Sequence, residues 1–582
     1  MQAALEKAKA DGLLTELPAS IPVERAKRPE HGDFASNVAL ALAKGAGKPP
    51  RVLGEALAER LRAVGGVDLA EVSVAGPGFI NLKFSDSFWQ RRLLDILGAG
   101  KEWGRGEAKK APRVLVEYLS ANPTGPLHFA HGRHAAVGDS LTRLLRFAGY
   151  DVVREFYIND AGNQVAMLAL SVWTRYMEEA RAADASVPEV AFPENGYRGD
   201  YIKGLGRELF QRDGGKWISA EPPADIEPIK QFGIQRCLDM IKGTLGRFDV
   251  SFDVWQSERA LHDSGDVTGT LDVLDRAGYI DRRDDAVWLK TTVLWGDDKD
   301  RVVVKTGGLP TYLLADIAYH RKKIERGFDD LCDIWGADHH GHVPRMKAAL
   351  KALGHDPDRL SVLLIQMVSL LRNGKPVPMG KREGEFVTLD AVIEEIGRDA
   401  TRFFYLMRRH DTPLEFDLEL AKRQSMDNPV YYAQYAHARC ASILRRADEL
   451  QAPRLAASPA VTAQLALPEE IAIMRRLSDF PDFVADAAAA REPHRLVQYI
   501  QELAGLFQSY YTVTKNRNDT ILPQESQRVG DWRATWDWQK TGARLLWVES
   551  IRQVLEIALG LLGVSAPQAM KRIGEGEAED AS

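Results

Sequence analysis

Two histidines stand three positions apart in the segment GPLHFAHGR, and their spacing could serve phosphate chemistry. His128 and His131 follow a loop that contains Pro and Gly, and a run with helical spacing begins at His131. At a helix N-terminus, side chains three apart lie on one face, beside backbone N–H groups that have no partner within the helix. That geometry suits a triphosphate. On spacing alone, however, such a pair is more often an ordinary surface or core pair.

The segment WGADHHGHVPR offers a different chemistry. Asp338, His339, His340 and His342 could together bind a metal ion. The segment superficially resembles the Asp-His-His phosphoesterases, which bind paired metals with further aspartates from other strands. The nearest acidic cluster, at 297–300, lies among charged residues rather than at a strand end. Metal-dependent phosphoester hydrolysis therefore stays an alternative, but a disfavoured one.

The hydrophobic pattern predicts a scaffold for these residues. A β-branched run at 114–119 precedes the histidine loop, and a second run at 151–158 follows at the spacing of a parallel βαβ crossover. Further strands are predicted within 329–336 and 361–371. Together they predict a doubly wound, Rossmann-type parallel sheet, in which ligands bind at the carboxyl ends of the strands.

Other parts of the chain have different patterns. The first hundred residues mix helical spacing with a short strand-like ending at 76–84, which predicts a small α+β domain. Residues 181–306 are too long a stretch for a connecting loop, so we expect an inserted subdomain there. From about residue 426 to 570 the pattern is helical throughout. The predicted fold class is multidomain α/β, with an α+β N-terminal domain and an all-α C-terminal bundle.

Composition narrows the function classes. At 582 residues the chain exceeds one hydrophobic core, and its net charge of −6 means that any RNA contact must come from local patches. Cys237, Cys332 and Cys440 are too far apart in sequence to indicate a disulfide framework or a cysteine zinc site. No long apolar span and no secretion signal stand out, which predicts a cytoplasmic protein without membrane contact.

The histidine segment also carries a family resemblance. SANPTGPLHFAHGR at 120–133, with REFYINDAGNQ at 154–164, resembles the signature region of the arginyl-tRNA synthetases, and the resemblance extends from about Arg28 to Met570. It implies a two-step reaction. The arginine carboxylate attacks the α-phosphorus of ATP, and arginine then passes from the adenylate to the terminal ribose of tRNA-Arg. Magnesium would bridge the phosphates, tRNA would be needed for activation, and the enzyme would be a monomer.

The resemblance assigns the ATP site. The family's His-x-Gly-His motif reads HFAH here, with Ala130 in place of Gly, and its Lys-Met-Ser-Lys-Ser loop corresponds to PMGKREG. Lys381 takes the second lysine position, while Pro378 and Gly380 replace the first lysine and the serine. His128, His131 and Lys381 would stabilise phosphate charge as the catalytic residues. The full ATP-binding set would be His128, Ala130, His131, Gly336, Asp338, Met379 and Lys381.

The resemblance also assigns an arginine site. A guanidinium is planar, permanently charged and best held by bidentate oxygen acceptors. Glu117 lies near the carboxyl end of the first predicted strand, and Tyr312 and Asp316, four apart, share a helix face. These three would hold the guanidinium. Asn122 and His340 would hold the α-amino end.

The outer domains would bind tRNA. In the segment RPEHGDFASN of domain 1–100, Phe34 and Asn37 would contact the tRNA elbow. Tyr431, Tyr435 and Arg439 would meet bases and phosphates in the helical anticodon-binding domain, 426–582, beyond a catalytic domain at 101–425. The departures in PMGKREG leave a second alternative open, an inactive relative that only binds RNA.

Overall fold

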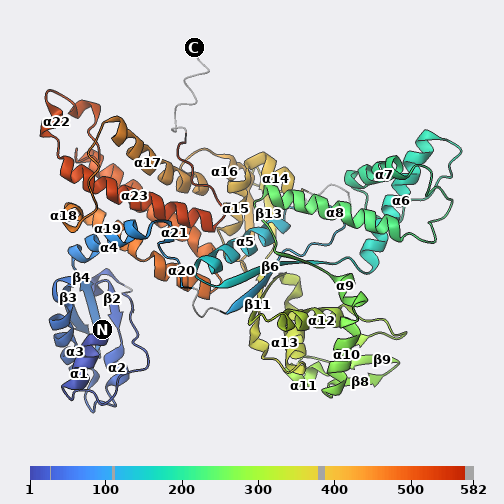
Figure 1. Cartoon of the computed structure of the whole chain (residues 1–582), viewed down its shortest axis with the longest axis horizontal. Coiled ribbons are helices and arrows are strands. Elements are labelled where there is room, and N and C mark those ends of the chain that lie inside the picture. The colour runs from blue at the N-terminus through green and yellow to red at the C-terminus, as the bar shows by residue number, and fades with distance from the viewer. Residues whose placement is uncertain (27, 108–111, 296, 378–386, 571–582) are drawn as a thin grey trace. The chain divides into compact units, whose positions relative to one another are not determined.

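The computed structural model describes residues 1–26, 28–107, 112–295, 297–377 and 387–570 (Figure 1). The chain divides into two compact units. Unit 1 comprises Met1–Trp103, Ala436–Phe480 and Leu503–Leu555, and unit 2 comprises Gly104–Tyr435, Pro481–Glu502 and Glu556–Ser582. The C-terminal helices are thus shared between the units, and the domain borders near residues 100 and 425 stay predictions.

A parallel sheet of five strands is the centre of unit 2. It has the order β12-β11-β5-β6-β7 and is formed by β5 (Arg113–Glu117), β6 (Asp151–Ile158), β7 (Val254–Ser257), β11 (Asp330–Gly336) and β12 (Leu360–Ile365). Its central strand β5 carries Val114, Leu115 and Val116, which are fully buried, as expected for a strand covered on both faces. The structure confirms the Rossmann-type sheet.

Helices flank this sheet. The first to follow β5 is α5 (His131–Phe147), and α12 (Tyr312–Glu325) and α13 (Val343–Ala352) share a hydrophobic core with β5 and β11. Three long helices, α6 (Asn163–Ala183), α7 (Asp200–Asp213) and α8 (Glu227–Arg247), pack together as a separate group (Figure 1).

A smaller α/β layer precedes α12. It contains α9 (Glu258–Asp263), α10 (Asp266–Arg276), α11 (Thr291–Trp295) and an antiparallel sheet of β8 (Ile280–Arg283), β9 (Ala286–Leu289) and β10 (Arg301–Val304). The stretch predicted as one insertion, 181–306, contains β7, which pairs with β6 at the edge of the main sheet. It is therefore not one continuous insertion. A four-residue strand is too short to produce a recognisable sequence pattern.

The run at 361–371, predicted as one strand, is two strands in two sheets. After β12 the chain leaves the parallel sheet at Gln366, whose N–H donates to the carbonyl of His410, and Met367 is exposed. The continuation, β13 (Val368–Arg372), pairs with β14 (Lys375–Pro376) and β15 (Leu414–Asp417). Around this sheet lie α14 (Leu389–Ile396), α15 (Arg398–Leu406) and α16 (Leu418–Lys422).

The first part of unit 1 is a small α+β fold, as predicted. An antiparallel sheet, ordered β1-β2-β4-β3, packs on helices through a core that includes Leu5, Leu53, Leu57 and Ile80. The elements are α1 (Gln2–Ala10), β1 (Glu24–Arg25), β2 (Phe34–Ser36), α2 (Val38–Leu42), α3 (Pro50–Gly65), β3 (Leu69–Ala75), β4 (Phe79–Phe84) and α4 (Asp86–Ala99).

The C-terminal part is helical, which confirms the predicted bundle class. Its helices are α17 (Pro429–Glu449), α18 (Pro459–Thr462), α19 (Pro468–Ser478), α20 (Phe480–Ala489), α21 (His494–Asn516), α22 (Trp532–Thr535) and α23 (Trp538–Leu561). On α21 the residues Leu496, Ile500, Leu503 and Phe507 are all fully buried, which is the spacing of one apolar helix face. In the part of the chain that the structure describes, no helix is long and apolar enough to span a membrane.

Candidate functional site

The two histidines lie together at the start of α5, with the geometry of a pair of hydrogen-bond donors. The Nδ1 atom of His128 accepts from the N–H of Ala130 at 3.0 Å, and Nδ1 of His131 accepts from the N–H of His128 at 3.1 Å. A neutral ring that accepts through Nδ1 carries its proton on Nε2. Both half-buried rings therefore present an Nε2–H donor, which is the form that binds a phosphate oxygen.

The departure at Ala130 causes no backbone strain. Ala130 has φ −61° and ψ −28°, a right-handed helical conformation open to any L-residue. Gly132, two positions further along, differs from Ala130, because a Cβ there would lie 2.6 Å from the ring of Tyr405. Tyr405 also donates its hydroxyl to the carbonyl of Phe129 at 2.6 Å, so the small residue lets this ring hold the loop in place.

A pocket of about 500 Å³ opens beside these histidines, and its lining includes His128, His131, Asn122, Gln164, Tyr197 and Tyr201. Asn122 donates from Nδ2 to Oε1 of Gln164 at 2.7 Å, and Tyr201 donates its hydroxyl to the carbonyl of Thr124 at 2.7 Å. The segment FPENGYRGDY, residues 192–201, thus forms a wall of the pocket. This part of the wall was not predicted, because the segment lies within the stretch 181–306 that was expected to be an insertion.

The predicted face of α12 is confirmed as a helix face. Asp316 accepts a hydrogen bond from Nε2 of His342 at 2.9 Å, and the ring of Tyr312 lies 6.1 Å from the ring of His342. Tyr312 is 70% exposed, so its hydroxyl is open to a ligand. The contact to Asp316 comes from His342, whereas His340 is exposed and faces the carbonyl of Ala337 at 3.3 Å.

A further carboxylate near Asp316 has no counterpart in the sequence-based set. Glu258 is the first residue of α9, directly after β7, and its side chain is 14% exposed. Burial, together with the nearby charge of Asp316, raises the pKa of Glu258 to about 7. Of the described residues, only His262 comes within ion-pair distance, at 3.9 Å. Among the described residues, Glu258 and Asp316 have only histidines, and no Lys or Arg, within ion-pair distance, which suits the two carboxylates to a cationic ligand.

Glu117 lies deeper than the resemblance implies. It is 7% exposed, and both of its oxygens are engaged: Oε2 accepts from Nζ of Lys323 at 2.6 Å and Oε1 from the hydroxyl of Ser120 at 2.8 Å. Burial raises the pKa of Glu117, although Lys323 opposes this effect. Glu117 is therefore a member of a buried polar group below the substrate-facing residues.

These residues share one edge of the parallel sheet. Glu117 ends β5, Glu258 follows β7, and the 3-10 helix Ala337–His342 follows Gly336 at the end of β11. Asp338 is exposed next to His339, at 3.7 Å. The carboxyl ends of parallel strands are where α/β sheets bind ligands. The structure therefore brings Glu117, Glu258 and the segment Ala337–His342 to the edge at which ligand binding is expected, and their binding roles stay predictions.

Two predicted ATP-binding residues cannot be placed. Met379 and Lys381, with the departures Pro378 and Gly380, lie outside the described residues. Among the residues that are described, no group of three or more His, Cys, Asp or Glu side chains is arranged to hold a metal ion. In the segment considered for metal binding, His342 faces Asp316 while His340 faces a backbone carbonyl.

In unit 1, one of the two predicted elbow-binding residues, Asn37, lines a pocket of about 510 Å³. Its lining includes Arg25, Arg28, His31, Asn37, Phe79 and Asn81. The guanidinium carbon of Arg25 lies 5.0 Å from the ring centre of Phe34. Basic groups next to exposed aromatic and amide groups are the combination that single-stranded bases and phosphates require.

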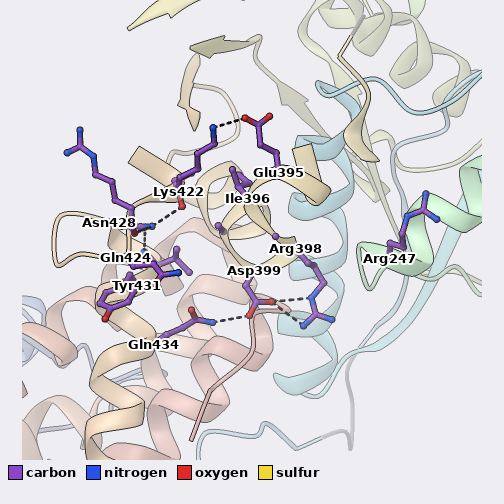
Figure 2. Close-up of a pocket in the computed structure, with 15 residues that line it drawn as sticks. Arg247, Glu395, Ile396, Arg398, Asp399, Lys422, Gln424, Asn428, Tyr431 and Gln434 are labelled. Atoms are coloured by element: carbon purple, nitrogen blue, oxygen red, sulfur yellow. Dashed lines mark hydrogen bonds and ion pairs between the residues drawn. The ribbon is translucent and has the colours of Figure 1, made fainter. Parts of the chain in front are cut away.

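The predicted residues of α17 have mixed surroundings. Tyr431 is only 8% exposed and stacks on Tyr435 at 5.9 Å. Its edge lines a pocket of about 630 Å³, shown in Figure 2, whose lining includes Arg247, Arg398, Lys422, Arg423 and Gln434. Within this pocket Lys422 pairs with Glu395 and Arg398 with Asp399 (Figure 2). In unit 1, Arg439 lies over the ring of Tyr511 at 4.5 Å.

Comparisons with known proteins match this architecture part by part. Residues 1–84 match the family model described as the arginyl tRNA synthetase N terminal domain, residues 93–411 the class I (R) tRNA synthetase catalytic domain, and residues 433–570 the DALR anticodon binding domain. The arginine–tRNA ligase of Citrifermentans bemidjiense is 45% identical over 97% of this chain and 98% of its own length. That of Heliobacterium modesticaldum is 45% identical over 95% and 94%.

Solved structures agree on the fold. The arginyl-tRNA synthetase of Thermus thermophilus superposes with a TM-score of 0.72 at 23% identity, over 98% of this chain and 99% of that one. At this identity the likeness concerns the fold alone.

Proposed function

The chain belongs to the arginyl-tRNA synthetase family, and from this membership we propose that it activates arginine with ATP and transfers it to the 3′ end of tRNA-Arg. The observation that carries the proposal is the pair of Nε2–H donors at the start of α5, on the same sheet edge as the carboxylates Asp316 and Glu258. The reaction has to bring together hydrogen-bond donors that bind the phosphates of ATP and carboxylates that bind the guanidinium of arginine.

The phosphate side of the site stabilises charge. When the arginine carboxylate oxygen bonds to the α-phosphorus, the bond to pyrophosphate breaks and negative charge grows on the leaving oxygens. His128 and His131 donate to these oxygens, and Lys381 adds a positive charge. Ala130, Gly336, Asp338 and Met379 complete the ATP site, and Mg²⁺ enters with the ATP phosphates as part of the substrate. In the second step a ribose hydroxyl attacks the acyl carbon and AMP leaves.

The cation side selects arginine. We assign the guanidinium to Asp316, Glu258 and the hydroxyl of Tyr312, with Glu117 below them, and the α-amino group to Asn122 and His340. His342 holds Asp316 in place through the 2.9 Å hydrogen bond, which supports a positioning role for it. The exposure of Tyr312 and the lack of a close cation at Glu258 support the assignment.

Glu258 should make arginine binding depend on pH. Its pKa of about 7 means that the free enzyme holds this carboxyl protonated below pH 7 and ionised above it. Only the ionised form attracts a guanidinium, so the KM for arginine should fall several-fold between pH 6 and pH 8, as the charged pair forms. Steady-state aminoacylation across this range measures it. In Glu258→Gln the dependence should disappear, and a dependence that persists unchanged would contradict the role.

The tRNA contacts belong to the same proposal. Phe34 and Asn37 with the pocket around them bind the tRNA elbow, and Tyr431, Tyr435 and Arg439 contribute to anticodon-arm binding. We also propose a cytoplasmic enzyme that works as a monomer. Its activation step requires tRNA.

Substitution at the elbow pocket should act on tRNA alone. Asn37→Ala and Phe34→Ala remove an amide and a stacking ring, so the KM for tRNA should rise roughly tenfold, in line with the loss of one stacked base. The KM for arginine should stay the same. Aminoacylation at varied tRNA concentration provides the measurement, and Val52→Ala, at an exposed position of α3, is a matched surface control. Unchanged tRNA KM in both variants would remove this pocket from the proposal.

Exchange of labelled pyrophosphate into ATP tests the function itself. The wild-type chain should catalyse exchange only when arginine and tRNA are both present. Exchange with arginine alone would refute the requirement for tRNA but keep the activity. No exchange under any condition, from a folded protein that binds tRNA, would refute the activity.

A further inference from the structure

A row of three carboxylates crosses the parallel sheet beneath the proposed arginine site. Glu117 on β5 is paired in register with Glu155 on β6 and with Asp333 on β11. Residues paired across parallel strands point to the same face, so the three acids are neighbours. All three are buried, with exposures of 7%, 0% and 0%. Like charges in such a row repel each other, and burial increases the cost.

Side chains from α12 and its C-terminal end bind all three carboxylates and offset their negative charge. On α12, Lys323 donates to Oε2 of Glu117 at 2.6 Å and to Oδ1 of Asp333 at 2.8 Å. A nitrogen of Arg326 lies 2.9 Å from Oε1 of Glu155, to which Tyr319 also donates. His320 reaches Oδ2 of Asp333 with Nε2 at 2.7 Å. These four residues lie at positions i, i+1, i+4 and i+7 of the helix, which is the face turned toward the sheet.

The same helix carries the proposed substrate residues at its other end. Tyr312 and Asp316 stand in the first turns of α12, and Nδ1 of His320 lies 2.8 Å from the backbone carbonyl of Asp316. The position of Asp316 relative to Glu117 is thus determined by the contacts of α12 with the acid row. The side chain of Lys323 donates to carboxylates on two strands, β5 and β11, and it is fully buried.

The backbone after Glu117 depends on the same group. Leu119 and Ser120 have φ of 71° and 36°, the left-handed region that L-residues rarely adopt. Ser120 donates its hydroxyl to Glu117 and accepts from the N–H of Tyr157 at 3.1 Å, which holds this turn. Asn122 follows two residues later, at the pocket beside His128.

We propose that Lys323 is a positioning residue for arginine: by bridging Glu117 and Asp333 it sets the distance between the first turns of α12 and the turn that leads to Asn122. It contacts no substrate. The inference rests on the proposed function, because it concerns the arginine site of that reaction.

The charges around Glu117 predict how the loss of Lys323 would change the pKa of Glu117. Burial would raise the pKa of Asp333, but Lys323 and His320 outweigh it and hold that pKa at about 2, whereas Glu117 keeps a raised pKa even beside Lys323. Glu117 faces Lys323 and His320 from α12, Asp333 from β11 and Glu155 from β6. Without Lys323, the pKa of Glu117 rises further, which favours the protonated carboxyl over the ionised one.

Lys323→Met tests this role. The KM for arginine should rise about tenfold or more, as expected when one member of a buried charged group is removed, while the KM for ATP stays within about twofold. Lys322→Met is the matched control, because Lys322 is the neighbouring residue on α12 and its amino group pairs with Asp266 and Glu325 rather than with the acid row. It should leave both KM values unchanged.

A double variant separates positioning from folding. Lys323→Met/Asp333→Asn removes one positive and one negative charge, so its melting temperature should exceed that of Lys323→Met, while the KM for arginine stays raised. If Lys323→Met does not fold, the double variant carries the test. A folded variant with the arginine KM of the wild type, or with arginine and ATP affected equally, overturns the inference. A wild-type chain without arginine-dependent exchange would instead refute the proposed function.

Discussion

Asp316→Asn is expected to raise the KM for arginine by roughly 30- to 1000-fold, the range that corresponds to about 2 to 4 kcal/mol for loss of one partner of a desolvated charge pair. The amide keeps the size of the side chain and can still contact His342, but it cannot offer two anionic oxygens to a guanidinium. The KM for ATP should change by no more than about twofold, because His128 and His131 lie at the start of a different helix. Steady-state exchange kinetics at varied arginine and ATP give both values.

The control for this prediction is Asp272→Asn, the same chemical change at an exposed position of α10. It should leave both KM values at the wild-type level. An Asp316→Asn enzyme in which arginine and ATP are affected equally would argue against the assignment of α12 to the guanidinium, since a general loss of active protein has that signature.

His128→Ala and His131→Ala are each expected to lower the rate of activation roughly 100-fold, the scale for removal of one donor that acts on developing charge. Each imidazole presents Nε2–H because its Nδ1 is taken by a backbone N–H. The donors act on the pentacoordinate phosphorus and the leaving pyrophosphate more than on bound ATP, so kcat should fall more than the KM for ATP rises. Pre-steady-state adenylate formation measures the step directly.

The folded state should survive these changes. Both rings are half-buried and lie at a helix start, so the melting temperature should shift by only a few degrees, which circular dichroism can follow. His355→Ala, at a half-buried position that follows α13, is the matched control and should keep full activity. Full activity in both pocket variants would show that ATP is bound elsewhere.

The strongest sequence signals identified the fold and the phosphate-binding helix. Strand β6 was predictable to the residue because the run at 151–158 is rich in β-branched and aromatic residues. The helix at His131 was predictable because a Pro- and Gly-containing loop precedes it. The pair of histidines required only local spacing, since both rings belong to a single loop and helix start.

Features that depend on long-range packing could not be predicted in this way. Glu258 is distinguished by burial beside Asp316, 58 positions away, and nothing in its own segment marks it. The same holds for His342, which is one of three nearby histidines and differs from His340 only by the direction of its side chain. β7 was missed because four residues make too short a pattern, and the split of 361–371 depends on where a carbonyl from residue 410 accepts a hydrogen bond.

The acid row beneath the site restricts how this sequence can change over generations. Replacement of Glu117 or Asp333 alone leaves the buried Lys323 with one carboxylate partner instead of two, and replacement of Glu155 removes the ion-pair partner of Arg326. A single step at any of the three is therefore disfavoured, whereas a second step at the partner residue compensates the change in charge. Substitutions there should therefore be inherited in coupled sets. We therefore expect the lowest tolerance to mutation at the three buried acids. Tyr312 is exposed, so only substrate binding should limit which residues can replace it.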